Sequence, residues 1–238
     1  MALPRLNDTP KYDLVIPSLQ ETVRYRPFLV KEQKVLMLAY EAQDKKHILK
    51  AILDTIDACV DGAIEVNKLA TYDIDYIFTQ IRAKSVGETA EIQILCSECE
   101  QANEVNVNLG AIEIDAKASS NNIVKINDTI SVKLRHPNYS YFMDNDEFFG
   151  EGRSQTDMML DLIISCLDSV MTEDEVIKIS DEPIEEVRNF IDSLTTDQFG
   201  MITKFVEDMP AMKQDIKFKC NACGEENNRT LKGLDDFF

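Results

Sequence analysis

The sequence predicts an α+β protein in which helices and short β-hairpins share the chain with a four-cysteine site. Three observations predict this class. Apolar residues recur at helical spacing in several segments of ten or more residues. Short stretches that alternate apolar and polar residues occur in pairs with turn residues between them. A Cys-x-x-Cys hairpin pattern occurs twice, 124 positions apart.

The repeated pattern predicts a metal site. Its copies span residues 92–99 and 216–223, and an asparagine, Asn103 or Asn227, follows four residues after each second cysteine. Each copy predicts a strand, a turn that offers two thiolates to tetrahedral Zn²⁺, and a return strand. The residues predicted to share one structural zinc ion are Cys96, Cys99, Cys220 and Cys223. A disulfide or redox role, or two free-thiol turns that never meet, are the alternatives.

A shared ion would also determine the domain organisation. It would make the chain between the two turns an insertion closed by metal, with the metal affinity contributing to folding. The predicted parts are an N-terminal hairpin with helices (1–90), a bipartite zinc ribbon with the C-terminal tail (91–112 and 214–238), and an inserted hairpin-plus-helices unit (113–213).

The N-terminal part begins with a hairpin over residues 12–28, since Tyr12, Leu14 and Ile16 alternate before a turn at Pro17. A helix is expected to start near Lys31. The apolar positions assigned to it are Val35, Leu36, Leu38 and Ala39.

Two stronger helices follow. The first spans residues 44–59 and carries a broad apolar stripe on which Cys59 is a core residue. The second has Thr71 as its N-cap, Asp73 in its first turn, and Gly87 as its end.

The inserted part begins with a polar linker and a second hairpin over residues 124–134. The acidic and aromatic stretch 139–153 is no calcium loop, because Phe149 stands where such a loop needs glycine. We expect a short helix there, followed by a partner-binding loop that contains Phe148 and Phe149.

Three helices complete the inserted part. Residues 159–170 give the cleanest amphipathic pattern, with Cys166 on the apolar face. A second helix starts around Pro183, and a third opens with Thr195 and Gln198 as a capping box. At the end of the chain, Phe237 and Phe238 are expected either to pack on the zinc hairpins or to dock into a partner.

Composition limits the function. With 43 acidic and 25 basic residues the formal net charge is −18, which disfavours nucleic-acid binding and favours protein partners. No apolar run approaches 18 residues and no signal-peptide core is present, so we expect synthesis in a reducing cytoplasm and no membrane span. There is no nucleophile elbow, phosphate loop or dinucleotide motif. We therefore expect no enzymatic activity and no small-molecule substrate.

Several stretches resemble a known family. They are Met1-Ala-Leu-Pro-Arg-Leu-Asn, residues 25–39 (YRPFLVKEQKVLMLA), residues 73–87 (DIDYIFTQIRAKSVG), the paired Cys-x-x-Cys turns and the closing Gly233-Leu-Asp-Asp-Phe-Phe. These are similar to the baseplate hub proteins of T4-like contractile-tailed bacteriophages.

The resemblance implies a structural subunit of the baseplate hub, located in the virion tail and assembled in the host cytoplasm. It implies contacts with other hub, central-spike, tail-tube or wedge proteins and no catalysis. A hub-assembly chaperone or catalyst absent from the mature particle is the first alternative. A zinc-ribbon nucleic-acid adaptor is the second.

Overall fold

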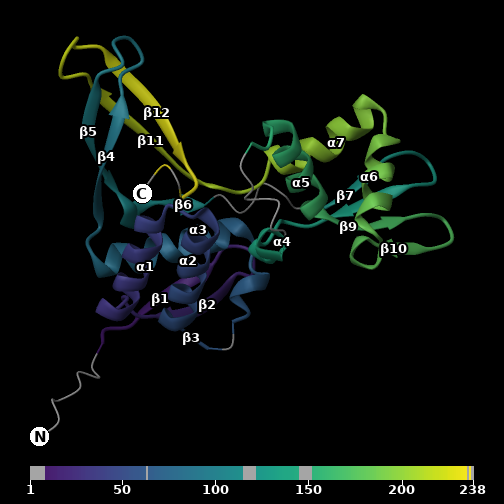
Figure 1. Cartoon of the computed structure of the whole chain (residues 1–238), viewed down its shortest axis with the longest axis horizontal. Helices are drawn as coiled ribbons and strands as arrows, with labels where there is room; N and C mark the ends of the chain where they lie inside the picture. The colour runs from purple at the N-terminus through teal and green to yellow at the C-terminus, as the bar shows by residue number, and fades with distance from the viewer. Residues whose placement is uncertain (1–8, 63, 115–121, 145–151, 235, 237–238) are drawn as a thin grey trace, which may run out of the picture. The chain divides into compact units, whose positions relative to one another are not determined.

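The computed structural model describes residues 9–62, 64–114, 122–144, 152–234 and 236. The chain divides into two compact units (Figure 1). Unit 1 combines residues 1–115 with residues 211–238, and unit 2 consists of residues 116–210. Both contain helices and small antiparallel sheets, so the predicted α+β class is confirmed.

Unit 1 begins with the predicted hairpin. Strands β1 (Tyr12–Ile16) and β2 (Glu21–Tyr25) pair antiparallel, and β3 (Val60–Asp61) adds to β2. Gln20, with a φ of 55°, adopts the left-handed conformation that closes the turn. Leu14 and Ile16 are buried in the core, as the alternation of apolar and polar residues in this strand predicts.

Three helices follow, as predicted: α1 (Val30–Ala42), α2 (Lys45–Cys59) and α3 (Thr71–Ser85). The Asp44 side chain caps α2 by accepting from the backbone N–H groups of Lys46 and His47. Helices α1, α2 and α3 lie together in Figure 1, and α2 packs against both of the others.

Two details of these helices differ from the prediction. In α1, Leu36 and Ala39 are buried, whereas Val35 and Leu38 are 49% and 66% exposed. Thr71 is the first residue of α3 rather than its N-cap. A side chain within the helix does the capping instead: buried Asp73 accepts from Ala70 N–H and from both the N–H and the hydroxyl of Ser18. That network links α3 to the first hairpin.

The remainder of unit 1 is built from two hairpins far apart in sequence. Strand β4 (Thr89–Leu95) pairs with β5 (Ala102–Asn108), and β11 (Met212–Lys219) pairs with β12 (Glu226–Lys232). A two-residue strand that the sequence did not predict, β6 (Glu113–Ile114), pairs with β11. One hydrophobic cluster contains residues of both hairpins and of α3, namely Ala83, Ala90, Val107, Leu109, Ile112, Met212, Ile216 and Leu231.

Unit 2 holds a four-stranded antiparallel sheet in the order β10-β9-β8-β7. Its strands are β7 (Ile123–Lys125), β8 (Ser131–Leu134), β9 (Leu167–Met171) and β10 (Val176–Lys178). The pairing of β7 with β8 confirms the predicted second hairpin. The helices are α4 (Tyr139–Asp144), α5 (Gln155–Cys166), α6 (Ile184–Asp192) and α7 (Thr196–Glu207), with short 3₁₀ turns elsewhere in the chain.

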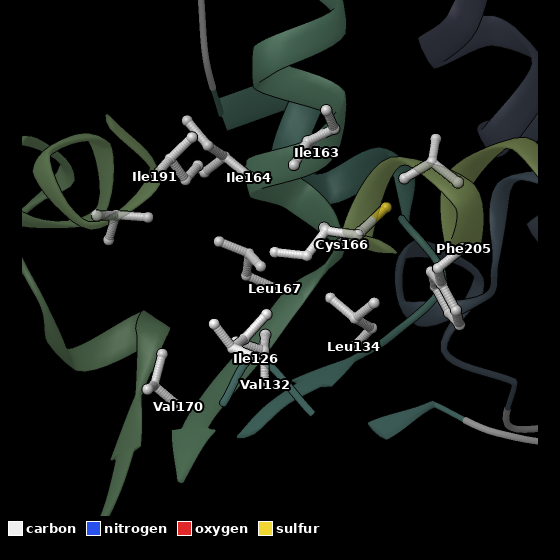
Figure 2. Close-up of a cluster of buried hydrophobic side chains, with 13 residues drawn as sticks. Ile126, Val132, Leu134, Ile163, Ile164, Cys166, Leu167, Val170, Ile191 and Phe205 are labelled. Carbon is white, nitrogen blue, oxygen red and sulfur yellow. The ribbon is translucent and has the colours of Figure 1, made fainter. Parts of the chain in front are cut away.

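Figure 2 shows the core of this unit, where side chains from the sheet and from α5, α6 and α7 converge. Cys166 and Leu134 are fully buried within it. The predicted capping box is present on α7: Thr195 N–H donates to Gln198 Oε1 at 2.9 Å, and Gln198 N–H donates to Thr195 Oγ1 at 3.3 Å.

The predicted helix over residues 159–170 is confirmed as far as Cys166 and wrong for its last four residues, 167–170. Helix α5 ends at Cys166, and the next five residues form β9, the strand between β8 and β10. Leu167 and Val170 face the core from a strand rather than from a helix. The apolar residues at these positions can be buried in a helix or in a strand. Residues 167–171 form a strand because β9 is hydrogen bonded to β8 on one edge and to β10 on the other.

Candidate metal centre

The four predicted ligands meet in unit 1. Each Sγ atom of Cys96, Cys99, Cys220 and Cys223 lies within 4.8 Å of the other three. They come from the β4–β5 turn and the β11–β12 turn, whose tips lie side by side in Figure 1. The alternative of two free-thiol turns that never meet is therefore excluded by the geometry.

Two of the sulfur–sulfur distances match the edge of a tetrahedral site. Cys96 Sγ lies 3.7 Å from Cys223 Sγ, and Cys99 Sγ lies 3.6 Å from Cys220 Sγ. A tetrahedron with metal–sulfur bonds of 2.3 Å has edges of about 3.8 Å. A disulfide would need about 2.05 Å, and all four cysteines are free. The donor set could therefore hold one metal ion.

The two turns have the same backbone hydrogen bonds. Cys96 N–H donates to Gln101 O and Glu100 N–H donates to Cys96 O. In the second turn Cys220 N–H donates to Glu225 O and Gly224 N–H donates to Cys220 O. The second bond of each set closes the Cys-x-x-Cys segment into a tight turn.

Backbone amides in each turn also favour the thiolate. The amides of Cys99 and Glu98 lower the pKa of Cys96. The corresponding amides, led by that of Cys223, lower the pKa of Cys220 to about 6. Because the thiolate is the form that binds a metal, the local structure of both turns prepares the first cysteine for ligation.

The turns differ at the residue that follows the second cysteine. Its conformation is left-handed in both, with φ of 57° at Glu100 and 79° at Gly224. A side chain is strained at this φ and glycine is not. A Cβ at Gly224 would meet only Lys219 Cε, at an ordinary 3.7 Å, so strain of the backbone is the relevant cost.

This difference gives a matched pair of predictions. Gly224→Ala is expected to lower the free energy of unfolding by about 1 kcal/mol, and Glu100→Gly to raise it by about 0.5 kcal/mol. Urea unfolding of the metal-loaded protein measures both. If both variants changed the free energy of unfolding in the same direction, backbone strain at the left-handed residue would not explain the difference between the turns.

The other cysteines and the predicted aromatic contacts lie elsewhere. Cys59 in α2 and Cys166 in α5 are buried core residues, and burial raises the pKa of each to about 11. Phe148 and Phe149, and likewise Phe237 and Phe238, lie outside the described residues, so their proposed partner contacts stay predictions.

Comparison with known proteins identifies the family. The family model described as T4 bacteriophage base plate protein matches residues 9–238. No curated protein and no solved structure gives a significant match. The match includes both hairpins of the cysteine cluster and the whole of unit 2. The chain therefore belongs to the T4 bacteriophage base plate protein family.

Proposed function

We propose that this chain is a structural subunit of the baseplate hub of a contractile-tailed phage, and that one Zn²⁺ bound by its four clustered cysteines holds unit 1 in shape. The observation that carries the proposal is the family match over nearly the whole chain. That match supports a location in the phage tail baseplate, where neighbouring subunits would be other baseplate proteins. The assignment to the hub is supported by the sequence resemblance described above.

The donor set supports a structural rather than a catalytic ion. Four thiolates complete a tetrahedral zinc site and leave no position for water or substrate. Cys96 and Cys220 are buried, while Cys99 and Cys223 are exposed, so an ion could enter from the side of the exposed pair. Bound zinc would tie the β4–β5 hairpin to the β11–β12 hairpin.

Helix α1 supports a role in protein contacts. Val30, Met37 and Leu38 lie on its solvent side and are 64%, 55% and 66% exposed. They share one face, since residues i, i+7 and i+8 of a helix lie close together. The opposite side packs Leu36 and Ala39 into the core. A helix with apolar residues on both sides is suited to burial between its own core and a partner protein.

The net charge of the chain supports protein partners over nucleic acid. The charge of −18 would repel a phosphate backbone. Within the described part of the chain, no helix has both the length and the apolar character needed to cross a membrane. Other baseplate proteins are therefore the proposed partners, with no small-molecule substrate.

A hollow among the described residues of unit 2 does not favour enzymatic activity. It lies in unit 2 between α5 and α6, with a volume of about 330 Å³. Its most buried acid, Asp161, is paired with Arg153 at 2.6 Å and approached by Arg188 at 3.8 Å. A carboxylate held in this way stabilises the fold and is poorly placed to act as a general base.

Two measurements test the proposal. Mass spectrometry of purified phage tails is expected to find the chain, and metal analysis of the isolated chain is expected to find one zinc per molecule. Absence of the chain from mature tails would overturn the subunit role and favour a transient assembly factor. Salt-sensitive DNA or RNA binding would instead favour a nucleic-acid adaptor.

A further inference from the structure

The asparagine that follows each Cys-x-x-Cys turn is buried next to the cysteine cluster. Asn103 in β5 and Asn227 in β12 are each 3% exposed, although the residues on either side of them are exposed. Burying a primary amide is unfavourable unless its oxygen and its N–H groups are hydrogen bonded. The partners of these two amides therefore indicate what they do.

Each amide oxygen accepts from the opposite hairpin. Asn103 Oδ1 accepts from the backbone N–H of Asn221 at 2.9 Å. Asn227 Oδ1 accepts from the backbone N–H and from the hydroxyl of Ser97, both at 2.9 Å. Asn221 and Ser97 occupy equivalent positions, directly after the first cysteine of each turn. Each asparagine thus fixes the backbone of the other hairpin beside a cysteine.

Each amide nitrogen faces the first cysteine of the opposite hairpin. Asn103 Nδ2 lies 3.7 Å from Cys220 Sγ, and Asn227 Nδ2 lies 3.5 Å from Cys96 Sγ. The same nitrogen also donates within its own hairpin, to the carbonyl two residues earlier, at 2.8 Å for Asn103 and 3.1 Å for Asn227. A backbone N–H can donate only to the oxygen of an amide. The N–H groups of Asn221 and Ser97 therefore identify the oxygen of each side chain, and the atom that faces sulfur is the nitrogen.

We propose that Asn103 and Asn227 are positioning residues of the metal centre and form a reciprocal clasp, in which each hairpin orients and stabilises the first thiolate of the other. This inference rests on metal binding by the four cysteines, as proposed above. Zn²⁺ with four thiolates carries a net charge of −2, and donors to sulfur stabilise that charge. The clasp also explains why the repeat extends four residues past each second cysteine.

The test is metal binding by full-length variants. Asn103→Ala and Asn227→Ala are each expected to weaken zinc affinity by about tenfold to a hundredfold in competition with a chromophoric chelator. In the cobalt-substituted protein, loss of a donor to sulfur is expected to move the sulfur-to-cobalt charge-transfer absorption to longer wavelength. A role confined to folding would leave that absorption unchanged in the folded, loaded variant.

Matched controls come from the same strands. Asn106→Ala in β5 and Asn228→Ala in β12 remove exposed asparagines and are expected to leave affinity and spectrum unchanged. If an alanine variant does not fold, Asn103→Asp and Asn227→Asp carry the test. They keep the oxygen that accepts from the backbone N–H but place a carboxylate beside the thiolate, so weaker binding is again expected.

The outcomes separate the two proposals. If the unaltered chain binds neither zinc nor cobalt through sulfur, the metal site itself is wrong. If it binds both, and the variants at Asn103 and Asn227 match the controls in affinity and spectrum, the clasp is overturned and the metal site stands.

Discussion

Removing the metal is expected to lower the melting temperature of unit 1 by about 10 °C or more. Apparent binding free energies of structural zinc sites are about 10–16 kcal/mol, and part of this energy holds folded structure. A loss of about 5 kcal/mol corresponds to about 10–20 °C for a unit of this size. Calorimetry before and after chelation measures the shift. Hydrogen exchange is expected to rise in β4, β5, β11 and β12 and to stay slow in the separate core of unit 2.

Cysteine variants provide the matched comparison. Cys99→Ser and Cys223→Ser change exposed residues, so their effect reports loss of a ligand rather than loss of packing. Both are expected to lose the metal and to melt like the chelated protein. Cys59→Ala, which alters a buried thiol in α2, is expected to keep one metal ion. Full retention of the melting temperature after complete metal removal would refute the structural role.

The second large effect is expected on assembly. Met37→Glu combined with Leu38→Glu places two charges on the exposed apolar face of α1. Burying an apolar side chain of this size against a partner is worth about 2 kcal/mol. We therefore expect at least a tenfold drop in incorporation of the chain into tails when a phage carries the double variant. Quantitative mass spectrometry of gradient-purified tails measures it.

The double variant is expected to fold normally, because both sites face solvent and glutamate is a good helix former. An unchanged melting temperature of the isolated chain verifies this. Val176→Glu is the control, since Val176 in β10 is 64% exposed but belongs to unit 2. Normal incorporation of the α1 variant would show that this face makes no essential contact.

Much of the local structure followed from sequence patterns because its causes are local. The hairpin over residues 12–28 rests on strict alternation around a turn, and the start of α7 rests on the Thr195–Gln198 capping box. Neither depends on a distant residue. The cysteine repeat was equally informative, since two Cys-x-x-Cys turns with matching flanks, each offering two thiolates, have few other uses.

Errors arose where distant residues decide between two locally acceptable states. The pattern of residues 159–170 fits one helix, but β8 and β10 recruit residues 167–171 into a sheet. In α1 the sequence shows apolar residues around much of the helix, and only the packing of unit 1 determines that Leu36 is buried and Leu38 exposed. Strand β6 is too short to have a pattern at all.

By itself the sequence determined the α+β class, the positions of most elements and the four cysteines as a set, because periodicity and ligand spacing are properties of neighbouring residues. Only the tertiary structure decided that the two turns meet with their sulfur atoms 3.6–3.7 Å apart across the hairpins. It also showed that Asn103 and Asn227 each accept a hydrogen bond from the opposite hairpin, from a residue more than 115 positions away in the sequence. The physical reason is that these contacts depend on how the two hairpins pack, and the pattern within either hairpin does not contain that information.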